Sequence, residues 1–225
     1  FSPRPRNSRI FRKFGYEGSL TYVENGAGIL ETREVRGEFR VEFQNSDSLE
    51  LSVADGYELL PAPFLIARGV TIPAGGYDLR TVRGQVTMGQ QWKASGTLFA
   101  EYGPFYDGDR TAFGYSGARV KINPRLAVEP GVSINRVTLP FGSFTTKLVS
   151  SRATFTLTPF LFVSGLVQYN SSNNTIATNA RLRWEYHAGS ELFVVYNDGR
   201  DTRPRGFPDL QNRSLVVKIN RLFRF

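Results

Sequence analysis

The sequence predicts an all-β fold, a transmembrane antiparallel up-and-down β-barrel with about 12 strands in this chain. Apolar and polar residues alternate with a period of two along most of the chain, whereas helical periodicity is almost absent. The alternating segments run for about 10 to 14 residues, longer than the ~5–6 of a typical globular strand and close to the ~9–11 that a tilted strand needs to cross a bilayer. Short and longer connections alternate along the chain, as in outer-membrane barrels.

Composition narrows the classes of protein without deciding between them. The chain has 225 residues, 40% of them hydrophobic, with a net charge of +8, no cysteine and one histidine. The absence of cysteine excludes a disulfide framework and a cysteine zinc site. No stretch reaches the ~18 apolar residues of a membrane helix, and the mean hydropathy is −0.27. These numbers fit a basic soluble protein, and they fit equally well a barrel whose strands each have one apolar and one polar face.

The expected strands each place their charged residues on one face. The clearest of these strands are residues 29–44, 92–102, 112–123, 126–137 and 175–187. In a barrel the apolar face meets lipid and the opposite face meets the lumen. The charges expected to line the lumen are Glu34, Arg36, Glu38, Arg40, Glu42, Lys93, Glu101, Arg119, Lys121, Glu129, Arg152, Arg181, Arg183, Glu185 and Lys218. These mixed charges would pair and narrow the lumen, or an excess of Arg and Lys would favour anions in an open pore.

The connections divide into two sets that alternate along the chain. Short turns are expected around Asn45-Ser46, Gln90, Asn123-Pro124, Pro159 and Ala188-Gly189. Longer connections are expected at 57–76, 103–110 and 197–213. Tight turns on one side of the membrane and longer loops on the other are typical of outer-membrane barrels. The expected interfacial aromatic residues are Trp92, Tyr102, Trp184 and Tyr186.

The final segment, 214–225, alternates and carries aromatic residues near its end. We expect one face of it to form a C-terminal insertion signal read by the barrel-assembly machinery, with the residues Leu215, Val217, Ile219, Phe223 and Phe225. Residues 1–8 are basic and contain two prolines, and we expect them to form an irregular leader before a single barrel domain that makes up residues 1–225.

Several segments carry a family resemblance. They are 63–66 (PFLI), 69–77 (GVTIPAGGY), 105–108 (FYDG), 139–144 (LPFGSF), 168–171 (QYNS), 179–198 (NARLRWEYHAGSELFVVYND) and 212–219 (NRSLVVKI). Together they resemble the C-terminal barrel region of an uncharacterised family of Gram-negative outer-membrane β-barrels, over roughly residues 50–225. In that family a carbohydrate-binding, family 9-like module precedes the barrel. The resemblance implies an outer-membrane location and a C-terminal portion of a longer or shortened protein, and it implies no reaction.

Catalytic, metal and cofactor sites are not expected. His187 is the single histidine and lies beside a turn on the polar face, so a catalytic triad or a histidine metal site lacks its partners. The Asp-Gly pairs at 107–108 and 198–199 fit turns better than calcium loops, because the spacing of an EF-hand is missing. Nucleic acid is not an expected partner, because the aromatic residues mostly lie opposite the charges.

The sequence leaves three functions open. The preferred one is an outer-membrane barrel that acts as a passive pore, or as an anchor for a partner or an N-terminal module. The second is a structural subunit of a larger cell-envelope complex. The third is a secreted soluble β-sandwich that binds glycans, because such a fold uses the same alternation with its apolar face inward. Expected partners are outer-membrane lipid, lipopolysaccharide and other envelope proteins, and no enzymatic activity is expected.

Overall fold

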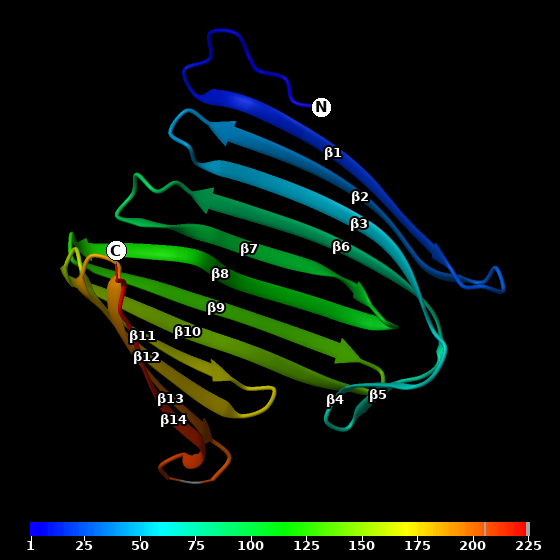
Figure 1. The fold of residues 1–225 in the computed structure, drawn as a ribbon. Helices are drawn as coiled ribbons and strands as arrows, with labels where there is room; N and C mark the ends of the chain where they lie inside the picture. Colours follow the sequence, from blue (N-terminus) through cyan, green and yellow to red (C-terminus); the bar gives the residue numbers. More distant parts are fainter. Residues whose placement is uncertain (205, 224–225) are drawn as a thin grey trace. The chain divides into compact units, whose positions relative to one another are not determined.

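A computed structural model describes residues 1–204 and 206–223 as an all-β protein. Its main element is a 12-stranded sheet with the order β1-β2-β3-β6-β7-β8-β9-β10-β11-β12-β13-β14, so each strand of the sheet lies beside the next one along the chain (Figure 1). The recorded strand pairs are all antiparallel. The prediction of an all-β, up-and-down antiparallel sheet with about 12 strands is therefore confirmed. Within the described residues, no helix is long and apolar enough to span a membrane.

The strands of the sheet have 10 to 17 residues. They are β1 Phe11–Glu24, β2 Leu30–Phe43, β3 Ser48–Leu60, β6 Gly75–Met88, β7 Ala94–Phe105, β8 Gly108–Asn123, β9 Leu126–Leu139, β10 Gly142–Thr158, β11 Leu161–Asn170, β12 Thr175–His187, β13 Ser190–Asp201 and β14 Asp209–Asn220. A separate two-stranded hairpin consists of β4 Phe64–Ala67 and β5 Val70–Ile72. The chain divides into two compact units, residues 1–115 with 133–146 and residues 116–132 with 147–225.

The strand register of the first unit sorts its side chains onto two faces. Glu38 of β2 lies opposite Ser52 of β3, and Ser52 lies opposite Arg83 of β6. Leu51 and Val53 point to the other face. We call the face that carries Glu38 the charged face of the first unit and the opposite one its apolar face.

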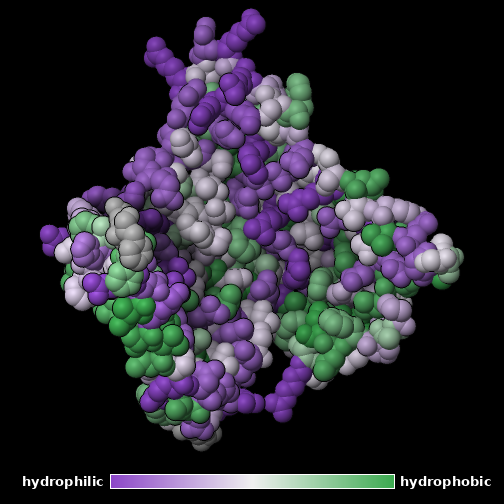
Figure 2. Space-filling view, viewed as in Figure 1, coloured by the Kyte–Doolittle hydropathy of each residue, from purple (hydrophilic) through white to green (hydrophobic). Residues whose placement is uncertain are grey.

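Burial in the first unit is inverted relative to a soluble protein. Seven aliphatic residues of the apolar face, Val35, Leu49, Leu51, Val53, Val82, Val86 and Leu98, are 40% to 51% exposed, although Val41 on the same face is buried. On the charged face, by contrast, Glu50 and Ser52 are buried. Figure 2 shows hydrophobic residues exposed beside hydrophilic ones on the visible face. Soluble proteins bury such apolar faces against a second layer.

The buried apolar cluster of the first unit lies around the β4–β5 hairpin. Val70 and Ile72 of β5 pack with Tyr77, with Tyr106, and with Val137 and Leu139 of β9. Figure 1 shows the hairpin beside the ends of β9 and β10. Tyr77 lies opposite Glu58 in the register, on the charged face. The hairpin therefore covers one end of the charged face with apolar side chains.

The second unit shows the same alternation in β10–β14. Arg152, Leu166 and Asn179 lie side by side on β10, β11 and β12, because Leu166 is the register partner of both Arg152 and Asn179. Arg181 and Arg183 share that face. The opposite face carries Trp184 and, on β14, Leu215, Val217 and Ile219, all of them exposed.

The turns fall where the sequence places the short connections. The chain reverses at 44–47, 89–93, 124–125, 159–160 and 188–189. On the other side, the connections at 61–74 and 202–208 are long. The connection expected at 103–110 is shorter than predicted, because only residues 106–107 separate β7 from β8. Tyr106 and Asp107 both adopt positive φ, of 47° and 49°, as a tight two-residue hairpin turn requires.

The outer edge of β1 pairs with the start of the chain. The Tyr16 amide donates to the Phe1 carbonyl at 2.8 Å, and the Phe14 amide donates to the Pro3 carbonyl at 3.0 Å. The amino group of Phe1 in turn donates to the Tyr16 carbonyl at 2.9 Å. Residues 1–10 contain no strand, and the first residues of the chain satisfy part of an edge that would otherwise be unpaired.

The β4–β5 hairpin depends on Ile72, which is fully buried. We expect Ile72→Ala to lower the free energy of unfolding by about 2–5 kcal/mol, because it leaves a cavity among packed side chains. Leu65→Ala in the same hairpin is the control, since Leu65 is exposed. Urea unfolding in detergent measures both variants, and equal losses in the two would contradict this account of the hairpin.

Candidate functional site

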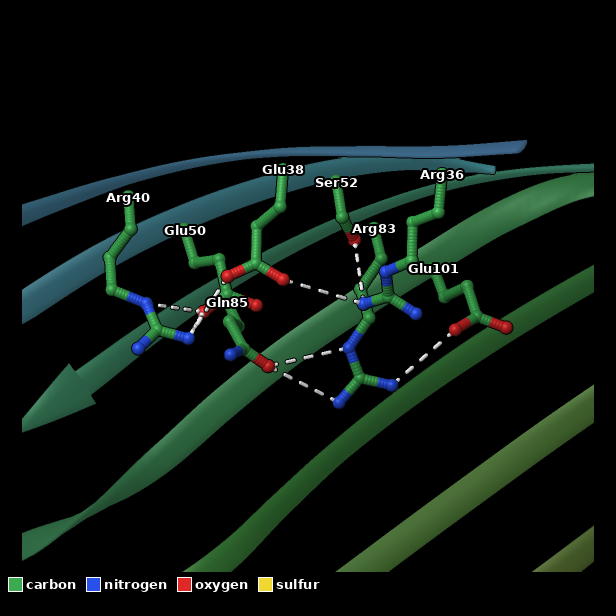
Figure 3. A network of polar contacts seen from close by, with 8 residues as sticks. All are labelled: Arg36, Glu38, Arg40, Glu50, Ser52, Arg83, Gln85 and Glu101. Carbon is green, nitrogen blue, oxygen red and sulfur yellow. Dashed lines mark hydrogen bonds and ion pairs between the residues drawn. The ribbon is translucent and has the colours of Figure 1, made fainter. Parts of the chain in front are cut away.

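The charged face of the first unit carries a network of ion pairs and hydrogen bonds in two adjacent groups, one on β2 and β3 and one on β6 to β8 (Figure 3). Arg40 of β2 donates to Glu50 of β3 at 2.9 Å through Nε and to Glu38 at 3.0 Å. Arg36 donates to Ser52 at 3.4 Å and lies 3.7 Å from Glu38. Two contacts therefore join β2 to β3, one from Arg40 to Glu50 and one from Arg36 to Ser52.

The second group of the network joins β6, β7 and β8. Arg83 donates to Gln85 at 3.3 Å and to Glu101 at 3.4 Å. Arg110 of β8 also donates to Glu101, which thus accepts from two arginines. The Arg83 guanidinium lies 4.1 Å from the centre of the Phe99 ring, which adds a cation–π contact.

Exposure differs between the two signs of charge. The side chains of Glu38, Glu50 and Glu101 are 8% to 15% exposed, while those of the arginines that pair with them are 31% to 47% exposed. The carboxylates thus lie beneath the guanidinium groups. Each buried carboxylate has a cationic partner, as burial of a charge requires.

A groove opens on this unit where the network approaches the hairpin cluster. Its lining includes Glu34, Glu58, Phe105 and Arg110. Tyr106 donates to Glu58 at 2.6 Å, and burial, together with this hydrogen bond, raises the pKa of Tyr106. This hydrogen bond connects the β7–β8 turn to the end of β3.

A Gly at position 103 is required beside this network. A Cβ there would lie 1.8 Å from the Arg80 carbonyl oxygen of the neighbouring strand. No side chain fits at that distance, so the close approach of β6 and β7 depends on Gly103.

The charged face of the second unit is built differently. Arg183 donates to Glu191 of β13 at 2.7 Å through Nε, and its guanidinium lies between the rings of Phe162 and Phe193 at 5.7 and 5.8 Å. In the described part of this unit, Arg152, Arg181 and Lys218 form no ion pair with a carboxylate. Ion pairing is therefore extensive on the charged face of the first unit, whereas Arg152, Arg181 and Lys218 on the charged face of β10–β14 lack it.

The end of β13, the start of β14 and the connection between them carry further ion pairs. Asp198 accepts from Arg200 at 2.5 Å and from Arg213 at 3.0 Å. Asp201 pairs with Arg203. Neither Asp-Gly segment gathers carboxylates, and no group of three or more potential metal ligands occurs within residues 1–204 and 206–223.

All but one of the residues predicted to line the lumen lie in strands of the sheet. Glu34, Arg36, Glu38, Arg40 and Glu42 share a face of β2, and Glu101, Arg152, Arg181, Arg183, Glu185 and Lys218 lie in β7, β10, β12 and β14. Arg119 and Lys121 lie in β8 and Glu129 in β9. Lys93 was expected inside a strand, but it lies in the connection before β7, whose pairing begins only at Gly96.

The aromatic and terminal candidates occupy several places. Trp92 lies in the connection between β6 and β7, Tyr102 in β7, and Trp184 and Tyr186 in β12 with ring centres 6.0 Å apart. Phe223 follows β14, and Phe225 lies outside the described residues. His187 is exposed at the end of β12, opposite Ser190.

Sequence reasoning missed several members of the network. Glu50, Arg83 and Arg110 are central to it, and Glu191 is the partner of Arg183. The period-two rule could have found Glu50 and Arg83, because each stands between two apolar or small residues of an alternating strand. The apolar hairpin could not have been found this way, because its strands have only four and three residues.

Comparison of the chain with known protein families, with curated proteins and with solved structures finds no match. The family resemblance of the sequence therefore stays a prediction, and the functional argument rests on the residues themselves.

The network yields a stability prediction at Glu101. We expect Glu101→Gln to lower the free energy of unfolding by about 1–3 kcal/mol, because Arg83 and Arg110 lose a shared, largely buried acceptor charge. The matched control is Asp55→Asn, which breaks the exposed pair with Arg80 and should cost about 0–1 kcal/mol. Chemical unfolding in detergent measures both, and a larger loss in the control would overturn the assignment.

A second prediction concerns Asp47, in the turn between β2 and β3. Asp47 accepts from the Gly89 amide at 2.8 Å and from the Trp92 indole at 2.9 Å, and these hydrogen bonds lower its pKa below the ordinary 3.8. Because the folded-state pKa is lowered, the Asp47 carboxylate stabilises the fold above pH 3.8, and this contribution is lost as the pH falls through the folded-state value.

We therefore expect Asp47→Asn to be less stable than the wild type at pH 7, with the difference shrinking as the pH falls below 3.8. Urea midpoints at a series of pH values, followed by Trp fluorescence, measure the difference. A gap between the two proteins that stays constant with pH would show that the Asp47 charge does not act in this way.

Proposed function

We propose that this chain is an outer-membrane β-barrel of a Gram-negative bacterium, with its apolar faces in lipid and its charged faces around a lumen. The inverted burial carries the proposal. Leu49, Leu51 and Val53 of β3 are 45% to 49% exposed, while Glu50 and Ser52 between them are buried. Exposing a continuous apolar face to water is costly, and in a bilayer the same face is in its preferred surroundings.

Closure of the sheet is part of this proposal. β1 and β14 are the end strands of the sheet order, and a membrane-spanning sheet must pair its edges, because lipid offers no hydrogen bonds to backbone groups. Residues 1–3 already pair with Tyr16 and Phe14, so closure requires β14 to replace them along this part of the β1 edge.

The soluble β-sandwich is the less favoured alternative. A sandwich packs two sheets through their apolar faces. In the described chain, the second sheet is only the β4–β5 hairpin, and its apolar contacts include Tyr77 on the charged face. The exposed apolar face is left uncovered by it.

Within the barrel, we assign the chain a passive pore for small solutes. The sparse pairing of cations on β10–β14 supports a pore, because uncompensated charges are favourable beside water. The packed hairpin and the ion-pair network of the first unit favour the second candidate, a membrane anchor or scaffold for a partner, a missing module or a larger envelope complex.

Two measurements test the proposal in order. Phase separation in a detergent of low cloud point should place the refolded protein in the detergent phase, and recovery as a compact monomer in the aqueous phase would refute the barrel. The same preparation in a planar bilayer should then give stable single-channel steps. If the protein partitions into detergent but gives no current, the barrel proposal stands, and the anchor or scaffold function replaces the pore.

A further inference from the structure

The register of β10–β14 aligns the charged face of the second unit into rows of neighbouring side chains. One row holds Arg183 of β12, Phe193 of β13 and Lys218 of β14. The next row holds Arg181 between Ser164 and Val195. Rows of side chains on one face lie about 7 Å apart along a strand, and neighbouring strands lie about 4.8 Å apart.

The third row runs from Arg152 through Leu166 and Asn179 to Asn197 and Ser214. Asn179 donates to Asn197, and Asn197 donates to Ser214 at 3.0 Å. This amide ladder is neutral. In these three rows of β10–β14 every charge that the structure describes is therefore positive, and we call Arg152, Arg181, Arg183 and Lys218 the cationic belt.

Within the described register of β10–β14, carboxylates on this face stand only in the rows beyond the belt. Glu185 and Glu191 lie next to the β12–β13 turn, where Glu191 pairs with Arg183 and Glu185 accepts from the Gly189 amide at 3.0 Å. Asp201 and Asp209 face each other at the opposite end of β13. The acids thus sit at the two ends of the strands and the cations sit between them.

The belt contrasts with the first unit, where Arg36, Arg40, Arg83 and Arg110 are matched by Glu38, Glu50 and Glu101. Arg181 and Arg183, two residues apart on one strand, repel each other, and the repulsion is strong where water is limited. An anion between them would relieve it. Arginine also presents several donors in a plane that suits oxyanions and chloride.

We propose that the cationic belt makes the pore selective for small anions, with chloride or a small carboxylate as the solute that passes Arg152, Arg181, Arg183 and Lys218. This inference rests on the proposed pore. The four cations lie on β10, β12 and β14. Transient coordination by them favours anion entry, and the single member paired with a carboxylate, Arg183, leaves the other three to exchange ligands.

The test is the reversal potential of the refolded full chain in a planar bilayer between unequal KCl solutions. The wild type should prefer chloride over potassium. The triple variant Arg152→Gln, Arg181→Gln, Lys218→Gln should lower the chloride-to-potassium permeability ratio to about one, and the corresponding triple Glu variant should invert the preference. The variant Arg152→Lys, Arg181→Lys should keep it.

The matched control removes three positive charges outside the belt, by Arg4→Gln, Arg68→Gln and Arg203→Gln, and should leave the ratio unchanged. Partition into detergent checks that each variant folds, and if the triple variant does not fold, Arg152→Gln and Lys218→Gln are measured singly, each with a smaller fall expected. A wild type that conducts without preferring chloride, or a preference that survives loss of the belt, overturns this inference and leaves the pore intact. A wild type without current refutes the pore itself, and the inference with it.

Discussion

Antiparallel pairing in register is the interaction on which the rest of this structure depends. Side chains alternate between the two faces of each strand, so a single register fixes which residues share a face. In β2, β3 and β6 the register brings Glu38, Ser52 and Arg83 to the same face and leaves Leu51 and Val53 on the other. A slip by one residue would place Glu50 among the aliphatic side chains, where no cation is available.

The ion-pair network and the apolar hairpin are two ways of filling the same face. Along most of β2, β3, β6 and β7 the charged face is filled by arginines stacked over buried carboxylates. At one end Ile72 and its neighbours replace those charges. On β6 the face changes from charged to apolar between Arg83 and Tyr77, which are three periods of the two-residue alternation apart. In the first unit, ion pairs and the apolar hairpin therefore fill the charged face. In the described part of the second unit, Arg152, Arg181 and Lys218 have no carboxylate partner.

The features predicted correctly from the sequence are those that the alternation of apolar and polar residues determines. Strand positions, the turns at 44–47 and 188–189, and the shared face of Glu34 to Glu42 follow from a period of two, which is a local property. The 103–110 connection was overestimated because Phe105 and Gly108 read as loop residues, although Tyr106 and Asp107 alone make the turn through positive φ. The β4–β5 hairpin and the pairing of Arg183 with Glu191 depend on contacts between distant segments, and no local pattern specifies them.

The central claim is that the exposed apolar face meets lipid. Spin labels placed one at a time from residue 49 to residue 54 of β3, in protein refolded into liposomes, measure it through collisions with oxygen, which concentrates in lipid, and with a polar nickel complex, which stays in water. The account predicts that oxygen accessibility peaks at Leu49, Leu51 and Val53 and falls at Glu50, Ser52 and Ala54. Oxygen peaks at the even positions, or nickel accessibility that is high at the odd ones, would contradict it.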